Sequence, residues 1–411
     1  MKPDPIPKNI ETPDDRPLPP GWRRARLGEV CEDRTGIRDP RREPDKPLRY
    51  VDITSVDNII KRIISPKTIL GKEAPSRARQ VIRVGDVIVS TTRPNLNAVA
   101  MVPLDLDDQI CSTGFCVLRA DHNLDRDYLF AFVQTQEFVQ GLSELVRGAL
   151  YPAVTDNQVK DQLIPLPPLS EQQRIAAILN EQMAAVERAR AAAGARLEAA
   201  KALPAAYLRT VFNSPLAQKW PRMRLGEICE ITARQVDPKV PEFGNLPHIN
   251  GENIEGGMCR LTYLKTAAEN GMVSSKYLFE PDDVLYSKLR PYLRKAVVAD
   301  FRGVCSADMY PIRVNQQVLD PHFTAWMLVS DEFSKYADEE SRRARMPKLN
   351  REQLFAWKIP MPSISEQRRL ISMVSNRITL VRRTQRALEE ELAAINALPA
   401  ALLRRAFNGD L

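Results

Sequence analysis

No part of the sequence approaches the ~18 consecutive apolar residues that a membrane-spanning helix requires. The N-terminal residues Met1 to Pro7 carry charge and proline where a secretory signal would have an apolar run. We therefore expect a cytoplasmic protein that has no membrane partner.

Cysteine and histidine are also scarce, at six and three residues in a chain of 411. Such a low cysteine count does not make a disulfide framework, so we expect reduced thiols in the core. The three histidines, His122, His248 and His322, are scattered along the chain. This spacing assembles no metal site, and we expect none.

Positive charge is in modest excess, with a net charge of +7, which weakly favours an anionic partner. Its distribution is more informative, because the run from Arg342 to Lys348 carries four positive charges in seven residues. A second run, from Arg34 to Arg49, is diluted by acidic residues.

The most informative feature of the chain is an internal repeat. IPLPPLSEQQRI at residues 164–175 returns as IPMPSISEQRRL at residues 359–370, and ALPAAYLRTVFN at 202–213 returns as ALPAALLRRAFN at 397–408. Shorter matches pair RLGEVCE at 26–32 with RLGEICE at 224–230, and DVIVSTTRP at 86–94 with DVLYSKLRP at 283–291. Residues 33–80 and 231–277 show no convincing similarity. The plan is domain, helix, domain, helix.

Each copy of the repeat predicts a long helix after the proline-rich segment. Ser170 and Gln173 fit a capping box at the start of the first helix, and we expect Pro204 and Pro399 to end or kink the two helices. Apolar residues recur at alternating steps of four and three, the a/d pattern of a coiled coil. The expected interface residues are Leu179, Met183, Val186, Leu197, Val374, Ile378, Val381, Leu388, Leu392 and Ile395.

One polar residue, Arg190 or Gln385, interrupts each stripe at matching positions and could fix the register. A single stripe would more often pack on its own domain. Two matching stripes in one chain favour an antiparallel pair, which we expect to form a rigid bar with a pseudo-twofold axis.

The remaining sequence predicts mixed α/β domains in which strands come first and helices follow. Short strands are expected at 48–54, 84–90, 98–102, 115–118, 283–287 and 296–298, and helices at 128–145 and 322–337.

The duplicated proline-Ser-Glu-Gln helix start, the Gly-Asp-Val and Arg-Pro strand and loop, and the C-terminal LRRAFNGDL closely resemble the DNA specificity subunit of Type I restriction-modification systems. The resemblance runs from Leu18 to Leu411. It implies an α+β fold, with two target recognition domains separated by two conserved helices packed as an antiparallel coiled coil. The implied divisions are an N-terminal extension at 1–17, recognition domains at 18–165 and 214–358, and helical spacers at 166–213 and 359–411.

The resemblance also implies a function, namely recognition of an asymmetric bipartite target in double-stranded DNA. The implied partners are two methyltransferase subunits and translocase/endonuclease subunits. The Asn-Pro-Pro-aromatic motif and glycine-bearing cofactor loop of an adenine methyltransferase are absent, as is the phosphate loop of a translocase. We therefore expect a non-catalytic chain that needs no cofactor.

Candidate DNA contacts cluster in the two loops that follow the Asp-Val strands. Arg93 and Arg290 occupy equivalent positions, each before a proline that should hold it extended, and an arginine that braces its own loop is an equal alternative. The other candidates lie in the same loops or just before the long helices. They are Thr92, Asn95, Asn97, Tyr151, Lys288, Arg294, Arg343, Arg345 and Lys348.

Two other functions remain open on the sequence alone. One is the specificity component of a Type IIB-like system, which differs in the gene products that copurify. The other is a coiled-coil interaction protein that never touches nucleic acid. It predicts no salt-dependent DNA binding, whereas the favoured function predicts an affinity that falls steeply with salt.

Overall fold

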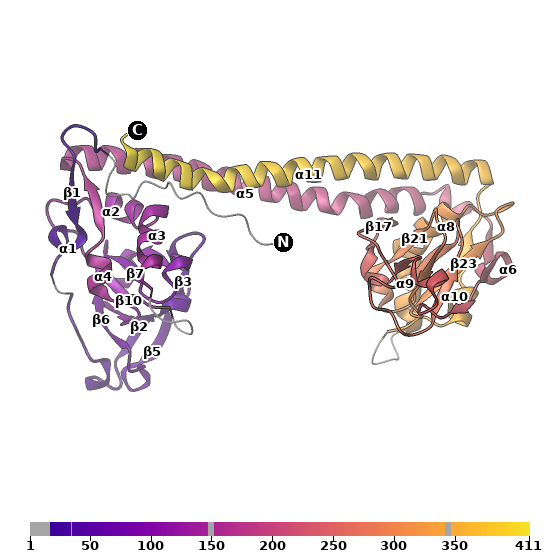
Figure 1. Cartoon of the computed structure of the whole chain (residues 1–411), viewed down its shortest axis with the longest axis horizontal. Coiled ribbons are helices and arrows are strands. Elements are labelled where there is room, and N and C mark those ends of the chain that lie inside the picture. The colour runs from indigo at the N-terminus through magenta and orange to yellow at the C-terminus, as the bar shows by residue number, and fades with distance from the viewer. Residues whose placement is uncertain (1–16, 34, 147–151, 342–346) are drawn as a thin grey trace. The chain divides into compact units, whose positions relative to one another are not determined.

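The computed structural model describes residues 17–33, 35–146, 152–341 and 347–411, which fall into two compact units (Figure 1). The first unit consists of the residues up to Ala192 together with Leu392–Leu411. The second unit consists of Ala193–Glu391. Each unit therefore contains one mixed α/β domain, the beginning of one long helix and the end of the other. In the described ranges, no helix is both long and apolar enough to cross a membrane.

Two small sheets form the centre of the first domain. One has the order β5-β2-β9-β6 and the other the order β10-β7-β8, while β1 pairs with β11. The strands are β1 Arg23–Arg26, β2 Pro47–Val51, β5 Lys67–Leu70, β6 Ala78–Ile82, β7 Val87–Ser90, β8 Val99–Met101, β9 Gln109–Ser112, β10 Phe115–Leu118 and β11 Leu163–Leu166. A short hairpin, β3 Val56–Asp57 with β4 Arg62–Ile63, completes the domain.

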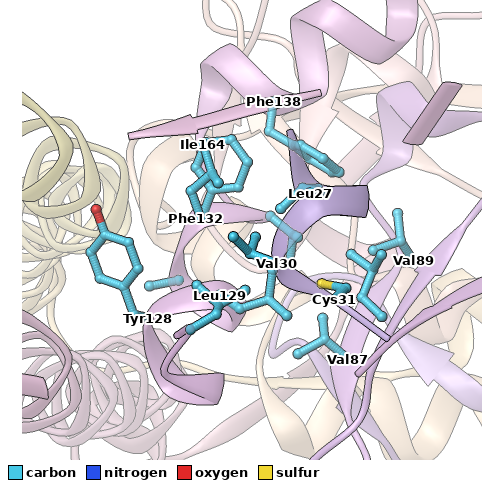
Figure 2. Packing of buried hydrophobic residues seen from close by; sticks show 14 of the residues in the cluster. Leu27, Val30, Cys31, Val87, Val89, Tyr128, Leu129, Phe132, Phe138 and Ile164 are labelled. Atoms are coloured by element: carbon cyan, nitrogen blue, oxygen red, sulfur yellow. The ribbon is translucent and has the colours of Figure 1, made fainter. Parts of the chain in front are cut away.

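Alternate residues of β7 enter two different cores. Val87 and Val89 face the helices, whereas Ile88 faces the cluster between the two sheets. The strand is buried on both faces, which explains why its sequence is an uninterrupted apolar run rather than an alternating one. Figure 2 shows Leu129 beside Val30 and Val87 on the helical side.

The helices of the first domain are α1 Leu27–Val30, α2 Arg126–Phe132, α3 Gln136–Glu144 and α4 Asp156–Lys160. The single helix expected at 128–145 is wrong, because Thr135 starts a new one. Its hydroxyl accepts a hydrogen bond from the Phe138 N–H at 3.2 Å, and so serves as the N-cap of α3. The second domain repeats this break at Ser330, whose hydroxyl accepts from the Phe333 N–H at 3.3 Å.

The second domain has the same plan. Its sheets have the orders β14-β19-β22-β15-β18 and β13-β23-β20-β21, and β12 pairs with β24. The strands are β12 Arg222–Arg224, β13 Cys229–Ile231, β14 Gln235–Val236, β15 Pro247–Ile249, β16 Ile254–Glu255, β17 Arg260–Leu261, β18 Lys265–Thr266, β19 Lys276–Phe279, β20 Val284–Ser287, β21 Ala296–Val298, β22 Gly303–Cys305, β23 Met309–Val314 and β24 Lys358–Pro360. The helices are α6 Leu225–Ile228, α7 Pro241–Gly244, α8 Pro321–Leu328, α9 Asp331–Ser341 and α10 Arg351–Ala356.

The repeat extends through the region where the sequences show no similarity. Strand β2 pairs in parallel with β9 through Val51 and Cys111, and β15 pairs in parallel with β22 through Ile249 and Cys305. Hairpins β3–β4 and β16–β17 follow at the same interval of 198 residues. The backbone pairing is thus retained although most of the side chains differ.

An ion pair with a buried carboxylate occupies the same place in each domain. Asp86 is 2% exposed, and its two oxygens accept from Arg119 at 2.8 Å each. Asp283 is 1% exposed and accepts from Arg313 at 2.9 and 3.0 Å. Each carboxylate also accepts a backbone N–H three residues earlier in the chain, which fixes the turn before the central strand. The Asp-Val motif of the sequence is therefore a structural anchor.

The two long helices are α5 Leu169–Phe212 and α11 Ile364–Asn408. Pro204 and Pro399 lie inside them, so these prolines do not end the helices, which was one of the two outcomes expected of them. A proline at position 204 provides no N–H for the carbonyl of Ala200. The side-chain amide of Gln385 supplies the missing donor at 3.0 Å.

The start of α5 also differs from the prediction. The helix begins at Leu169, so Ser170 lies within its first turn rather than at the N-cap. The buried side chain of Gln172 connects this turn to the domain instead. Its oxygen accepts from the Asp125 N–H at 2.8 Å, and its nitrogen donates to the carbonyls of Asn123 and Pro167 at 3.0 and 2.9 Å. Gln367 does the same at the start of α11, accepting from the Asp320 N–H at 2.8 Å.

Within each unit the two helices run antiparallel. In the first unit Arg190 donates to the Asn396 side chain at 2.8 Å, and Arg174 donates to the Leu411 carbonyl at 2.7 Å. In the second unit Arg196 pairs with Glu391 at 3.0 Å, and Arg377 lies over the Tyr207 ring at 5.6 Å from its centroid. Partner numbers fall as numbers along α5 rise, in the order expected of an antiparallel pair.

The expected interface residues differ in what they contact. Leu179, Val374 and Ile378 belong to the domain cores, whereas Val186, Leu197, Val381 and Leu388 are buried outside those clusters. Met183, Leu392 and Ile395 are half-buried. The first turns of each stripe thus attach the helix to its own domain, and the later turns face the other helix.

Candidate nucleic-acid interface

The two loops singled out in the sequence share one backbone conformation. Arg93 has φ 50° and ψ 60°, and Arg290 has φ 48° and ψ 65°. The expectation that the following proline holds each arginine extended is therefore wrong. Proline disfavours the right-handed helical region for the residue before it, but in this turn the alternative adopted is left-handed rather than extended.

Hydrogen bonds explain why the left-handed conformation persists. The Arg93 N–H donates to the Pro152 carbonyl at 2.8 Å, and the Arg93 carbonyl accepts from the Leu96 N–H at 2.9 Å. Arg290 donates to Pro347 and accepts from Leu293, each at 2.9 Å. The loop must therefore turn at the arginine to satisfy both backbone groups.

A second left-handed residue closes each loop. Asn97 has φ 46° and Arg294 has φ 51°, and each follows a short 3-10 turn, Pro94–Leu96 or Pro291–Leu293. A left-handed backbone costs a residue other than glycine roughly 1–2 kcal/mol. Two such residues in each loop are strain of the kind that accumulates at functional sites.

The neighbouring chain fixes the loops further. A β-bridge joins Thr92 to Ala153 in the first domain and Leu289 to Lys348 in the second. The Val154 N–H donates to the Thr91 carbonyl at 2.9 Å. Three of the candidate residues, Tyr151, Arg343 and Arg345, lie outside the described residues.

The hairpin that the sequence did not identify contacts the first loop. In hairpin β3–β4, Asn58 donates to the Leu96 carbonyl at 3.2 Å, and Lys61 donates to the Asn97 carbonyl at 2.6 Å. Burial lowers the pKa of Lys61 to about 8, against the raising effect of Asp57. In the second domain the Gly257 N–H, from hairpin β16–β17, donates to the Arg294 carbonyl at 2.8 Å. Only the structure could reveal this support, because the two hairpins share almost no side chains.

Exposed side chains on the loops differ between the domains although the backbone does not. Arg93, Asn95, Arg290 and Lys348 are exposed, and Thr92 is half-buried. Where the first loop has Asn95, the second has Tyr292, which is 52% exposed. The two loops thus share the arginine, the proline that follows it and the leucine at position 96 or 293, and they differ at Asn95 and Tyr292.

Two of the predicted contact residues are engaged inside the second domain. Lys288 is only 8% exposed; its ammonium group donates to the Ala307 carbonyl and lies 4.9 Å from the centroid of the Tyr310 ring. Burial, with Lys348 nearby, lowers the pKa of Lys288. Arg294 forms an ion pair with Asp331. Neither cation projects freely from the loop, and both are weaker candidates for direct contact than Arg290.

The cysteines supply no reactive group. All six are free thiols, and burial raises the pKa of Cys31 and of Cys229 to about 12 in each case. Within the described ranges, no group of three or more histidine, cysteine or acidic residues could hold a metal ion. The side chains of the two loops can therefore contribute hydrogen bonds and positive charge.

Two domains of one topology, each followed by a long helix and each presenting an arginine at the same strained turn, define a duplicated two-domain protein. The family described as Type I restriction modification DNA specificity domain matches residues 19–192 and again residues 217–393. The chain belongs to this family, whose model matches it twice.

Two proteins that are similar in sequence to this chain are specificity subunits of Type I restriction enzymes. The Type I restriction enzyme EcoDI specificity subunit of Escherichia coli is 26% identical over 305 residues, which cover 66% of this chain and 68% of that subunit. The HindI specificity subunit of Haemophilus influenzae is 25% identical over 162 residues, 38% of this chain and 34% of that protein.

Two solved structures share the fold over nearly the whole chain. The HsdS subunit from Thermoanaerobacter tengcongensis is 36% identical, with a TM-score of 0.66, 98% of this chain covered and 100% of that one. A chain from a study of complex assembly and conformational transition of the type I R-M system is also 36% identical. Its TM-score is 0.82, and the match covers 96% of this chain and 100% of that one.

Proposed function

We propose that this chain binds double-stranded DNA and recognises an asymmetric target in two parts, one read by each domain. The observation that carries the proposal is the pair of equivalent loops with unlike side chains. A common backbone would place each loop against the duplex in the same way. Different side chains would then select different bases, so the two half-sites should differ.

The shared and variable residues suit different roles in recognition. Arg93 and Arg290 are charged residues at the same position of both loops, as expected of contacts to phosphates, which position a protein without reading sequence. Thr92 and Asn95 in the first loop correspond to Leu289 and Tyr292 in the second. An asparagine can form two hydrogen bonds with adenine, whereas apolar groups contact the thymine methyl. The variable residues are therefore the candidates for base readout.

Partner subunits would complete the assembly. We propose two methyltransferase subunits docked on the long helices, with translocase/endonuclease subunits joining them. The helices offer apolar side chains to solvent, among them Leu380 at 60% exposed and Leu398 at 45% exposed. Methylation of adenine in duplex DNA requires the base to be flipped out of the stack, and we assign that step to the methyltransferase. This chain would select the site and position the catalytic subunits.

Binding measurements as a function of salt test the proposal. The chain, purified with its methyltransferase subunits, should bind duplex DNA with an affinity that falls linearly on a logarithmic salt scale, because neutralised phosphates release counterions. Selection from a random duplex pool should then recover two unlike half-sites with unread bases between them. Binding that is absent at low salt would contradict the proposal and favour a coiled-coil interaction protein.

A further inference from the structure

The turn of hairpin β3–β4 exposes aliphatic side chains next to the loop that carries Arg93. Ile59 is 73% exposed and Ile60 is 39% exposed. The residues on either side of this pair, Asn58 and Lys61, donate the hydrogen bonds that join the hairpin to the loop. The turn and the loop therefore belong to one surface of the first domain.

The second domain builds the same hairpin with a different turn sequence. The turn residues are Asn58, Ile59, Ile60 and Lys61 in the first domain and Gly256, Gly257, Met258 and Cys259 in the second. The last residue of each turn is left-handed, with φ 56° in the first domain and φ 47° in the second. Beyond the turn, the Ile64 N–H donates to the Ser55 carbonyl at 2.9 Å, and the Thr262 N–H donates to the Asn253 carbonyl at 2.8 Å. The two hairpins thus share a framework and differ in the side chains of their turns.

The two turns also differ in what covers them. Met258 and Cys259 are half-buried and pack against the main hydrophobic core of the second domain. The two glycines before them carry no side chain that could reach a partner. In the first domain, Ile59 and Ile60 are exposed to solvent instead. An exposed aliphatic turn is therefore a feature of the first domain that its counterpart lacks.

Hydrogen bonds hold this turn in one conformation. The Asp57 carboxylate accepts from the Ile59 N–H at 2.8 Å and from the Ile60 N–H at 3.1 Å. The Lys61 ammonium group donates to the Asn97 carbonyl at 2.6 Å and so ties the end of the turn to the loop. A turn that is ordered before binding loses little conformational entropy when a partner covers it. Ile59 is thus presented on a rigid support.

The charges around the turn favour an anionic partner. Arg62 directly follows the turn and is exposed, and Arg93 is exposed on the adjoining loop. The acidic residues of this part of the chain, Asp52 and Asp57, are already engaged. Asp52 pairs with Lys67, and Asp57 accepts the two backbone N–H groups of the turn. Two arginines beside a rigid aliphatic turn suit a duplex, whose phosphates lie on either side of grooves lined by bases.

We propose that Ile59 contacts the methyl group of thymine in the half-site that the first domain reads. The C5 methyl of thymine is the apolar group that base edges present in the major groove, so it is the group that an exposed isoleucine can recognise. Ile60 extends the same apolar surface. The second domain, with glycines in its turn, makes no such contact. The contact rests on the proposed function, and it adds the hairpin and the chemical group that the hairpin recognises.

Replacement of thymine by uracil tests the contact, because it removes only the methyl group. The chain, purified with its methyltransferase subunits, is titrated with selected target duplexes in which each thymine of either strand is replaced in turn. At one or more positions of a single half-site, the natural chain should bind the uracil duplex about fourfold more weakly, the value of one buried methyl group. Ile59→Ala should bind the thymine duplex at least about fourfold more weakly. This variant should lose no further affinity when uracil replaces the same thymine.

Leu104→Ala is the matched control. Leu104 is 76% exposed and follows β8. Val87 at the start of β7 pairs with Met101 at the end of β8, so Leu104 lies at the opposite end of these strands from the Arg93 loop. The control should retain the full sensitivity to uracil. Neither substitution should change the melting temperature, because both side chains are exposed.

Equal sensitivity to uracil in the natural chain and in Ile59→Ala would overturn the assignment. So would an affinity of the natural chain that no uracil replacement lowers. Both results leave the proposed function standing, because salt-dependent binding and the two unlike half-sites test it separately. If the natural complex bound no duplex at all, the proposed function would fail and the contact with it.

Discussion

The side-chain amide of Gln385 donates a hydrogen bond to the carbonyl oxygen of Ala200 at 3.0 Å, at the turn of α5 where Pro204 provides no N–H. A glutamine in the apolar stripe of one helix thus compensates for a proline in the other. The bond also fixes the register of the pair within the second unit, because sliding one helix by a turn would separate the two groups. Polar residues inside coiled-coil stripes are used for register in this way.

This relationship predicts coupling between positions 204 and 385. Gln385→Leu should destabilise the chain by about 1–3 kcal/mol, because the carbonyl of Ala200, a buried residue, loses the side-chain donor that Gln385 provides. Pro204→Ala restores a backbone donor and should remove most of that loss. Urea unfolding of the single and double variants measures the coupling. If Pro204→Ala stabilised both backgrounds equally, the bond would have no energetic role.

The helix pair within the second unit predicts different tolerance at two leucines of α11. Leu388 is 5% exposed and Leu380 is 60% exposed. Leu388→Asp places a charge in the buried stripe and should cost several kcal/mol. Leu380→Asp should change the unfolding free energy by less than about 0.5 kcal/mol. Under the proposed function, Leu388→Asp should also abolish sequence-specific DNA binding. Normal stability of the Leu388 variant would contradict the helix packing described above.

A buried histidine predicts a pH dependence of stability. Burial, together with Lys276 nearby, lowers the pKa of His248 to about 4, and its side chain is 2% exposed. An unfolded histidine has a pKa near 6.5. As pH falls from about 6.5 towards 4, the unfolded chain gains a proton that the folded chain does not, so stability falls.

The variant His248→Gln, which does not titrate in this range, isolates the effect. Between pH 7 and pH 5 the natural chain should lose about 1–2 kcal/mol more unfolding free energy than the variant. Urea unfolding at the two pH values measures the difference. Parallel losses in the two proteins would show that His248 titrates normally.

The loop arginines predict a loss of DNA affinity that does not depend on sequence. Arg93→Ala and Arg290→Ala should each weaken binding to the target and to unrelated duplex by a similar factor, and each should reduce the salt dependence. Arg188→Ala, at an exposed position of α5, is the matched control. Asn95→Ala should instead relax the preference at one half-site and leave the other unchanged. If the arginine variants bind as the control does, the loops do not form the interface.

The sequence predicted the framework because the repeat preserved residues with structural roles. Asp86 and Asp283 are buried carboxylates that pair with arginines, and Gln172 and Gln367 connect the long helices to their domains. Such side chains have few alternatives, so they recur and can be recognised. The two-domain plan followed from the repeat, and the antiparallel helices followed from its two matching apolar stripes.

The sequence did not reveal features carried by backbone bonds. Hairpins β3–β4 and β16–β17 support the loops through hydrogen bonds to main-chain carbonyls, donated by the side chains of Asn58 and Lys61 in the first domain and by the Gly257 N–H in the second. The left-handed arginines escaped prediction for a related reason. Local preference before proline favours an extended backbone, whereas bonds to Pro152 and Pro347 from the next part of the chain select another conformation. Likewise, the local sequence around Pro204 does not reveal that Gln385, 181 residues away, donates to the carbonyl that the proline leaves without a partner N–H.

Long-read detection of methylated adenine in the host genome tests the central claim most directly. The comparison is between cells with this gene intact and cells in which it is deleted, with the methyltransferase partner expressed in both. We predict that deletion removes methylation from one interrupted motif whose two halves differ in sequence. An unchanged pattern of methylation, while the partner methyltransferase remains active, would contradict the assignment of target recognition to this chain.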